Sequence, residues 1–186
     1  MILLLALGIG LVLGLGWARW LGNPYQLPRL KHPWLAIVAF LPQFFVTFFE
    51  RTRTFTLDWV AALAIVTSQA LLLLFAWFNR LLPGMMVLII GLVLNLAVMI
   101  ANGGFMPINP QTAERVVGKD RISSFEPGNR IGYKDILLPL KATRLEMLAD
   151  RYLPPDGFPY QVAFSLGDLF IAIGACWVLA YQKLNT

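Results

Sequence analysis

Three amide side chains are the residues best placed for chemistry in this sequence, because each stands within a long apolar run. Gln43, Gln69 and Asn95 fall near the middles of three successive runs, about 15–20 Å along each at roughly 1.5 Å per helical residue. Amides at that depth bond across helices, or they line a polar pocket for a lipid or quinone headgroup. We favour interhelical bonds and keep the pocket as the alternative.

Other kinds of chemistry lack their residue types. Cys176 is the only cysteine and His32 the only histidine, so neither an intrachain disulfide nor a thiolate metal cluster can form, and no second imidazole could complete a metal site. No charged residue falls deep in an apolar run, which argues against a proton relay or an ion-coupled transporter. The sequence therefore predicts no metal, no cofactor and no enzyme activity.

The composition is that of an integral membrane protein. Hydrophobic residues make up 58% of the 186 residues, against about 45–50% in soluble domains, and the mean hydropathy is +0.68. Because about 20 apolar residues suffice to cross the hydrocarbon layer, we expect one membrane domain over residues 1–186. The predicted fold is an all-α bundle of five transmembrane helices, at about residues 2–21, 33–49, 57–78, 84–100 and 166–181.

A polar segment over residues 102–164 separates the fourth and fifth predicted helices. It carries eight basic and seven acidic residues and is nearly neutral. Asn109 as N-cap, Pro110 at the first helical position and Gly118 past the end predict a helix. A capping-box pattern over residues 143–146 predicts a second helix. We therefore expect a partly helical extramembrane loop that rests on the bilayer surface or on a partner.

Small residues recur every four positions in two predicted helices. The first helix carries Gly10 and Gly14 between Ala6 and Ala18, and the last helix places Cys176 between two alanines. This spacing lines one helix face and lets a second helix approach closely. We expect these helices to pack against each other or against another protein.

Polar and glycine residues mark both ends of the loop. Gly103 and Gly104 allow the chain to leave the fourth helix through conformations closed to other residues, while Asn102 can bond the last carbonyls. The same bare backbone could approach a ligand headgroup instead. At the other end, Ser165 and Asp168 have the spacing of a capping box for the last helix.

These loop ends also carry a family resemblance. The Ala101-Asn102-Gly103-Gly104 run followed by Met106-Pro107, with Ser165-Leu166-Gly167-Asp168, resembles domain-of-unknown-function family 5317, a bacterial family of small multi-pass proteins. Residues 132–139 look similar to a further family feature, whereas Phe105 stands where a basic residue is expected. The resemblance implies a multi-pass membrane protein and supplies no activity.

The expected role is contact rather than catalysis. Basic residues are too scattered for a nucleic-acid surface, so membrane lipids and other membrane subunits are the expected partners. We interpret the chain as an accessory or scaffold subunit of a larger complex, with a respiratory or photosynthetic host as one option. The alternative is a lipid- or quinone-binding carrier or enzyme.

The expected location is the bacterial cytoplasmic membrane. Arg19, Arg29 and Lys31 follow an uncharged N-terminus, which favours the N-terminus outside and the C-terminus inside. The basic residues of the long loop argue for the opposite orientation.

Overall fold

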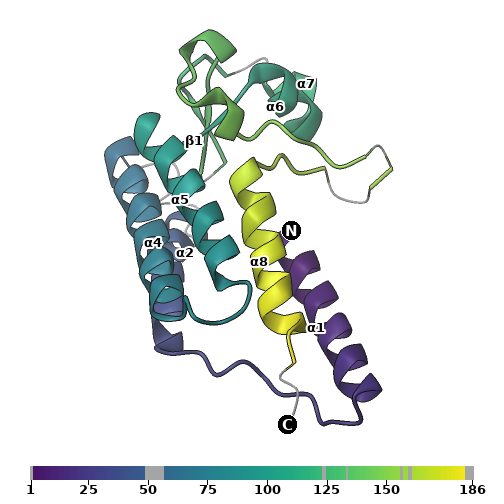
Figure 1. Cartoon of the computed structure of the whole chain (residues 1–186). Coiled ribbons are helices and arrows are strands. Elements are labelled where there is room, and N and C mark those ends of the chain that lie inside the picture. Colours follow the sequence, from purple (N-terminus) through teal and green to yellow (C-terminus); the bar gives the residue numbers. More distant parts are fainter. Residues whose placement is uncertain are drawn as a thin grey trace.

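The computed structural model describes residues 2–48, 57–122, 125–132, 134–155, 157–158 and 161–182. These residues form a mostly helical molecule with seven α-helices and one small sheet. Five apolar helices lie below a smaller polar unit, which we call the cap and which comprises the described residues from 102 to 165 (Figure 1). The apolar helices are α1 (Ile2–Trp20), α2 (Pro33–Phe48), α4 (Asp58–Phe78), α5 (Met85–Ala101) and α8 (Leu166–Ala180).

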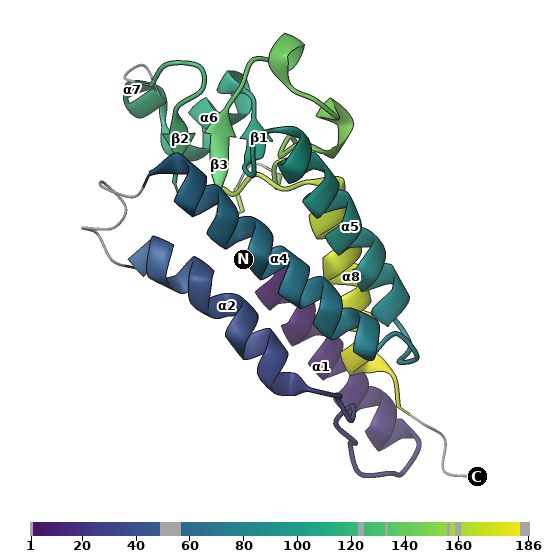
Figure 2. The ribbon, with the colours of Figure 1, turned by 90° about the vertical axis from the view of Figure 1, so that its left-hand side faces the viewer.

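The five apolar helices pack in the order α1, α8, α5, α4, α2, which differs from their order in the chain. The extensive helix contacts are those of α8 with α1 and α5, of α4 with α5, and of α2 with α4. Each end helix therefore packs mainly on one neighbour. Figure 2 shows α2 beside α4 on one side and α1 beside α8 on the other.

Glycine lets the helices around α8 approach to backbone contact. A Cβ added at Gly10 of α1 would lie 2.6 Å from the Cys176 carbonyl oxygen. On the other flank of α8, a Cβ added at Gly174 would lie 2.5 Å from the Leu88 amide nitrogen, and one at Gly91 would lie 2.5 Å from the Gly167 carbonyl oxygen. A side chain at any of these positions would force the two helices apart.

Side-chain amides and a tyrosine hydroxyl join the connections at the end of the molecule opposite the cap. We call this the basic end; it comprises residues 19–32, 79–84 and 181–182. Asn79 accepts from the Lys31 amide at 2.6 Å and donates to the Lys31 carbonyl at 2.9 Å. Tyr25 donates to the Leu179 carbonyl at 3.0 Å, and Gln182 exchanges hydrogen bonds with the backbone of Gln26. The connection between α1 and α2 is thus hydrogen-bonded both to the C-terminal end of α8 and to the C-terminal end of α4.

The cap has a small mixed sheet and two short helices. Its helices are α6 (Pro110–Val117) and α7 (Lys119–Ile122), and its strands are β1 (Met106–Ile108), β2 (Arg130–Ile131) and β3 (Asp135–Leu137). The strand order is β1-β3-β2, with β1 parallel and β2 antiparallel to β3. A buried cluster joins sheet and helices: Ile108, Ala113, Ile122, Ile131, Leu137 and Ala163.

The cap corrects two expectations. The all-α prediction is wrong there, because short apolar segments between turns pair as strands once the loop folds back on itself. The helix predicted from the capping box at residue 143 is also wrong: Thr143 is extended and Leu145 has φ +54°. Two 3-10 turns stand in this region, Leu140–Ala142 and Glu146–Leu148. The Asn102 side chain binds the Arg144 amide and carbonyl, which fixes this non-helical path.

The helix α6 has the boundaries that the sequence predicts. Asn109 accepts from the Thr112 amide at 2.8 Å, Pro110 occupies the first turn and Gly118 follows the last residue. For α4, the N-cap position is held by Leu57, which makes no side-chain capping hydrogen bond. The sequence also offers Thr56 as a cap for this helix, and that residue lies outside the described part of the chain.

Two helices of the described chain, α1 and α4, are long and apolar enough to cross a membrane by length and composition. Three shorter apolar helices accompany them, over Pro33–Pro42, Met85–Ala101 and Leu166–Ala180. Only about a fifth to a quarter of the apolar window of α1 and α4 is buried inside the molecule, at 22% and 28%.

The packing of α1 on α8 predicts a sharp contrast between neighbouring glycines. Gly10→Leu would overpack the contact with Cys176, so we expect a loss of about 1–3 kcal/mol and a Tm lower by roughly 2–4 °C per kcal/mol. Gly8→Leu is the matched control, since a Cβ there meets nothing within 4 Å. Thermal unfolding of the isolated chain in detergent measures both. Equal Tm values for the two variants would contradict this packing.

Candidate functional site

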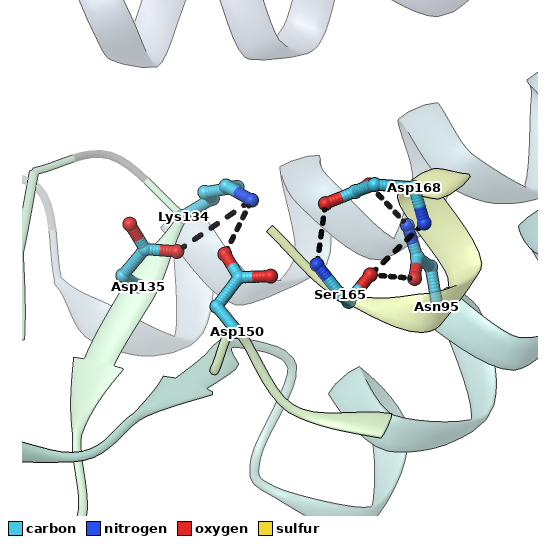
Figure 3. A network of polar contacts seen from close by, with 6 residues as sticks. All are labelled: Asn95, Lys134, Asp135, Asp150, Ser165 and Asp168. Atoms are coloured by element: carbon cyan, nitrogen blue, oxygen red, sulfur yellow. Dashed lines mark hydrogen bonds and ion pairs between the residues drawn. The ribbon is translucent and has the colours of Figure 1, made fainter. Parts of the chain in front are cut away.

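Six polar residues meet where the cap joins α5 and α8, and we call this group the polar junction (Figure 3). Lys134 and Asp135 lie at the start of β3, Asp150 follows the second 3-10 turn, Ser165 and Asp168 lie at the start of α8, and Asn95 projects from α5. Backbone pairing places them: Met106 donates to the Lys134 carbonyl at 2.8 Å, and Asp150 donates to the Pro107 carbonyl at 3.1 Å. The strand β1 therefore positions both Lys134 and Asp150.

One half of the polar junction is a closed hydrogen-bond network at the N-terminus of α8. Ser165 and Asp168 form the capping box that their spacing indicates, at 3.0 and 3.1 Å. Asn95 donates to Asp168 Oδ1 at 2.8 Å and accepts from the Ser165 hydroxyl at 2.9 Å. The buried Asn95 side chain thus bonds two residues at the start of α8, which links α5 to the N-terminus of its neighbour.

The other half is a buried ion pair within the cap. Lys134 Nζ lies 2.8 Å from Asp150 Oδ2 and 3.8 Å from Asp135 Oδ1. The Asp150 side chain is 1% exposed, and its Oδ1 atom is buried with no hydrogen-bond partner among the described residues. Asp135 and Asp150 thus share one ammonium group, and Asp168 adds to the negative charge that acts on it.

Burial raises the pKa of two of these carboxyls, Asp150 and Asp135. Burial raises the pKa of Asp150 to about 7, because desolvation outweighs the attraction of Lys134 and because Asp135 and Asp168 repel its charge. Burial likewise raises the pKa of Asp135. Desolvation opposes the charge of Lys134, yet its carboxylate neighbours together hold its pKa well above the usual range. The junction therefore exchanges a proton near neutral pH while the lysine stays charged.

The chemistry open to this group is ionic bonding and proton exchange. Lys134 occupies the space between the carboxylates that a cation would need, and the described residues contain no group of three or more His, Cys, Asp and Glu side chains suited to a metal ion. In the described chain the junction thus combines an ion pair within the cap with the hydrogen bonds by which Asn95 of α5 and Asp168 of α8 hold Ser165.

The three amides expected at mid-membrane depth are not joined in one site. Asn95 is bonded to α8, whereas Gln69 lies on α4 with its Oε1 atom buried and unpartnered among the described residues, as is the neighbouring Ser68 hydroxyl. The backbone of Gln43 belongs to α2, but its side chain lies outside the described part of the structure. No hydrogen bond between Gln69 and Asn95 is present.

The remaining predicted residues are placed at helix contacts and turns. Gly10 faces Cys176, and a Cβ added at Gly14 would lie 2.5 Å from the Leu179 carbonyl oxygen. Gly103 and Gly104 adopt left-handed conformations, with φ +76° and +91°, and Gly104 also packs against Ala62 of α4. Asn102 bonds the Val98 carbonyl, as expected of a helix end, and additionally the backbone of Arg144.

Sequence reasoning missed the charged half of the junction. Lys134, Asp135 and Asp150 belong to a loop whose charges are nearly balanced, so none of them stands out by composition. One signal was present, since Lys134 and Asp135 directly precede the apolar run Ile136-Leu137-Leu138, and a charge fused to a buried strand must itself be partly buried.

The raised pKa of Asp150 predicts a pH-dependent stability. Between about pH 4 and about pH 7, the folded state holds a proton that the unfolded state has released. Stability should therefore fall as pH rises through this window, by at most about 1.4 kcal/mol per pH unit. Asp150→Asn should flatten that slope, whereas Glu146→Gln, at an exposed pair with Arg151, should leave it unchanged. Tm measured at several pH values tests this; identical slopes for Asp150→Asn and wild type would contradict it.

Removal of the lysine predicts a second, larger effect. Lys134→Met leaves buried carboxylates without their cation, which costs about 3–5 kcal/mol when one partner of a buried pair is removed. The loss should be smaller at pH 5 than at pH 8, because the carboxyls then take up protons. The double variant Lys134→Met with Asp150→Asn should recover part of it. Hydrogen exchange of cap amides is the readout, and additive losses would count against a direct pair.

Comparison with known proteins places the chain in a family. A model described as a family of unknown function, DUF5317, matches residues 28–180. No curated protein and no solved structure matches the chain. The match spans α2 to α8 with the whole cap, including the loop ends on which the resemblance rests. The chain belongs to the DUF5317 family of unknown function.

Proposed function

We propose that this chain is an integral membrane protein that serves as an accessory subunit of a larger membrane complex. The observation that carries the proposal is the exposure of the end helices. The helix α1 buries only the face formed by Ala6, Gly10, Gly14 and Ala18. Its other side chains, such as Val12 at 68% exposed, face outward, as does Ile37 of α2 at 68%. Surfaces of this size and polarity need lipid or protein around them.

The helix lengths support a membrane location with a seated cap. The helices α1 and α4 have 19 and 21 residues, whereas α5 and α8 have 17 and 15. A helix of 15 residues is about 22 Å long, less than the roughly 30 Å hydrocarbon layer. Non-helical backbone is tolerated at membrane depth where protein surrounds it. We infer that the polar junction extends the short helices toward the membrane surface.

The charge distribution supports one orientation. Arg19, Arg29, Lys31 and Arg80 lie at the basic end, and Lys183 follows in sequence; no acidic residue occurs in residues 1–49, 59–113 or 169–186. These five basic residues are as many as the net charge of +5, because the other ten basic residues of the sequence are matched in number by its ten acidic residues. The positive-inside rule then favours the basic end in the cytoplasm and the cap outside. The basic residues of the cap carry less weight, because loops of about 60 residues and longer translocate largely regardless of their charge.

A second face of α1 supports contact with another helix. Gly8, Val12 and Gly16 lie four residues apart on it, and a Cβ added at either glycine meets nothing within 4 Å. The face with Gly10 and Gly14 is occupied by α8 and is not open to a partner. The open face offers a partner helix the same close approach that α8 makes on the occupied one.

The accessory role predicts a variant that folds but loses its complex. Gly8→Leu with Gly16→Leu should keep the Tm of the isolated chain and release the stoichiometric partner subunits that wild type retains on mild extraction. Native mass spectrometry of the extracted protein is the measurement, and Leu13→Phe, at an exposed position of α1 outside the Gly8, Val12 and Gly16 row, is the control. The proposal would be contradicted if the wild-type chain were extracted from its own membrane without any partner subunit.

The orientation has its own test by cysteine labelling. In a Cys176→Ser background, an impermeant maleimide on intact cells should label Glu114→Cys in the cap and should not label Leu81→Cys at the basic end, where the native side chain is 85% exposed. Both should react after permeabilisation. The reverse pattern would overturn the orientation, and labelling of both in intact cells would overturn the membrane crossing.

A further inference from the structure

The geometry points to a binding site for an anionic phospholipid on the outer face of α4 and α5 at the basic end, and this inference rests on the membrane location proposed above. The site has two parts. An apolar groove would take an acyl chain, and Arg80 at its end would bind the phosphate.

The groove lies between the two helices, which are seen side by side in Figure 1. Its volume is about 360 Å³, and it is lined almost entirely by apolar atoms. The lining residues are Ala70, Leu73, Leu74, Trp77, Ile89 and Val93. On α4 they span eight residues, from Ala70 to Trp77, which is about 10 Å along the helix axis. Leu74, Trp77 and Val93 are close to half exposed, so the groove is open along its length to the surrounding medium.

Arg80 is held at the end of this groove by Trp77, one of the lining residues. Its guanidinium carbon lies 4.9 Å from the centre of the Trp77 ring, and Nη1 donates to the Trp77 carbonyl at 3.2 Å. A guanidinium has five N–H donors in a planar fork that matches a phosphate. The Arg80 side chain makes no further hydrogen bond to the described residues, so most of these donors remain for a ligand.

Charge at this end selects an anion. The Asn79 side chain is bonded to the Lys31 backbone, which brings a second basic residue beside the α4–α5 connection. The sequence has no acidic residue between Asp58 and Glu114, so neither helix carries a competing carboxylate near the groove. An acyl chain gains little in a lipid-facing groove, because the bilayer is equally apolar. Discrimination between lipids must therefore come from the net charge of the headgroup, because Arg80 and Lys31 attract an anionic phosphate but repel the choline cation of a zwitterionic lipid.

The test uses the full chain, delipidated in neutral detergent and given phosphatidylglycerol and phosphatidylcholine with identical acyl chains. Native mass spectrometry scores the lipid retained. Wild type should prefer phosphatidylglycerol. Arg80→Gln should weaken that retention about fivefold, the change that roughly 1 kcal/mol per basic residue corresponds to. It should weaken retention of phosphatidylcholine less, because the choline cation already offsets the charge of that phosphate.

Two further variants make the result specific. Val93→Trp fills the groove from an exposed position and should reduce retention of both lipids, which separates a lipid from a free phosphate. Arg29→Gln removes another exposed arginine of the same end and should change nothing. The site would be overturned if wild type retained the two lipids equally, or if Val93→Trp retained as much of both lipids as wild type. It would also be overturned if Arg29→Gln lost as much phosphatidylglycerol as Arg80→Gln. Partner release is scored separately in the Gly8 and Gly16 variant, so the two proposals fail independently.

Discussion

Backbone contact along α8 is the constraint on which the rest of the molecule depends. Gly10 of α1 meets Cys176, while Gly84 and Gly91 of α5 meet Gly174 and Gly167. The two helices are antiparallel, and the glycines of each pair, Gly84 and Gly91 or Gly167 and Gly174, are seven residues apart. Both glycines on one side can therefore face both glycines on the other. Three helices are thereby held at a separation that larger side chains would prevent, and α4 and α2 complete the row through ordinary side-chain packing.

The cap is positioned by the same helix. The N-terminus of α8 carries Ser165 and Asp168, whose capping box is extended by Asn95 from α5. Asp168 also contributes to the field around Lys134 and Asp150. A buried pair of this kind adds little net stability, since desolvation offsets the attraction, but it penalises every arrangement in which one charge is buried alone. The junction thus contributes more to the specificity of the folded arrangement of the cap than to its free energy of unfolding.

The two ends of the molecule differ in their electrostatics, and this difference organises the proposed function. The basic end carries unpaired positive charge on short, well-tethered connections, while the cap balances its charges internally. A surface of the first kind is suited to anionic headgroups, and one of the second kind to an aqueous compartment. Between them, α1 and α2 offer apolar faces that are exposed in the described part of the chain.

The sequence by itself determined the elements whose cause is local. Apolar runs located the long helices, four-residue spacing located the faces of α1 and α8, and Asn109, Ser165 and Asp168 located helix starts, because a cap bonds within three residues of itself. Only the tertiary structure decided what depends on residues far apart in the chain. Asn102 draws residue 144 into a non-helical path, β1 and β3 pair across 29 residues, and Lys134 meets Asp150 only after that pairing. Local composition carries no record of these partners, since each contact exists only when the cap has folded onto α5 and α8.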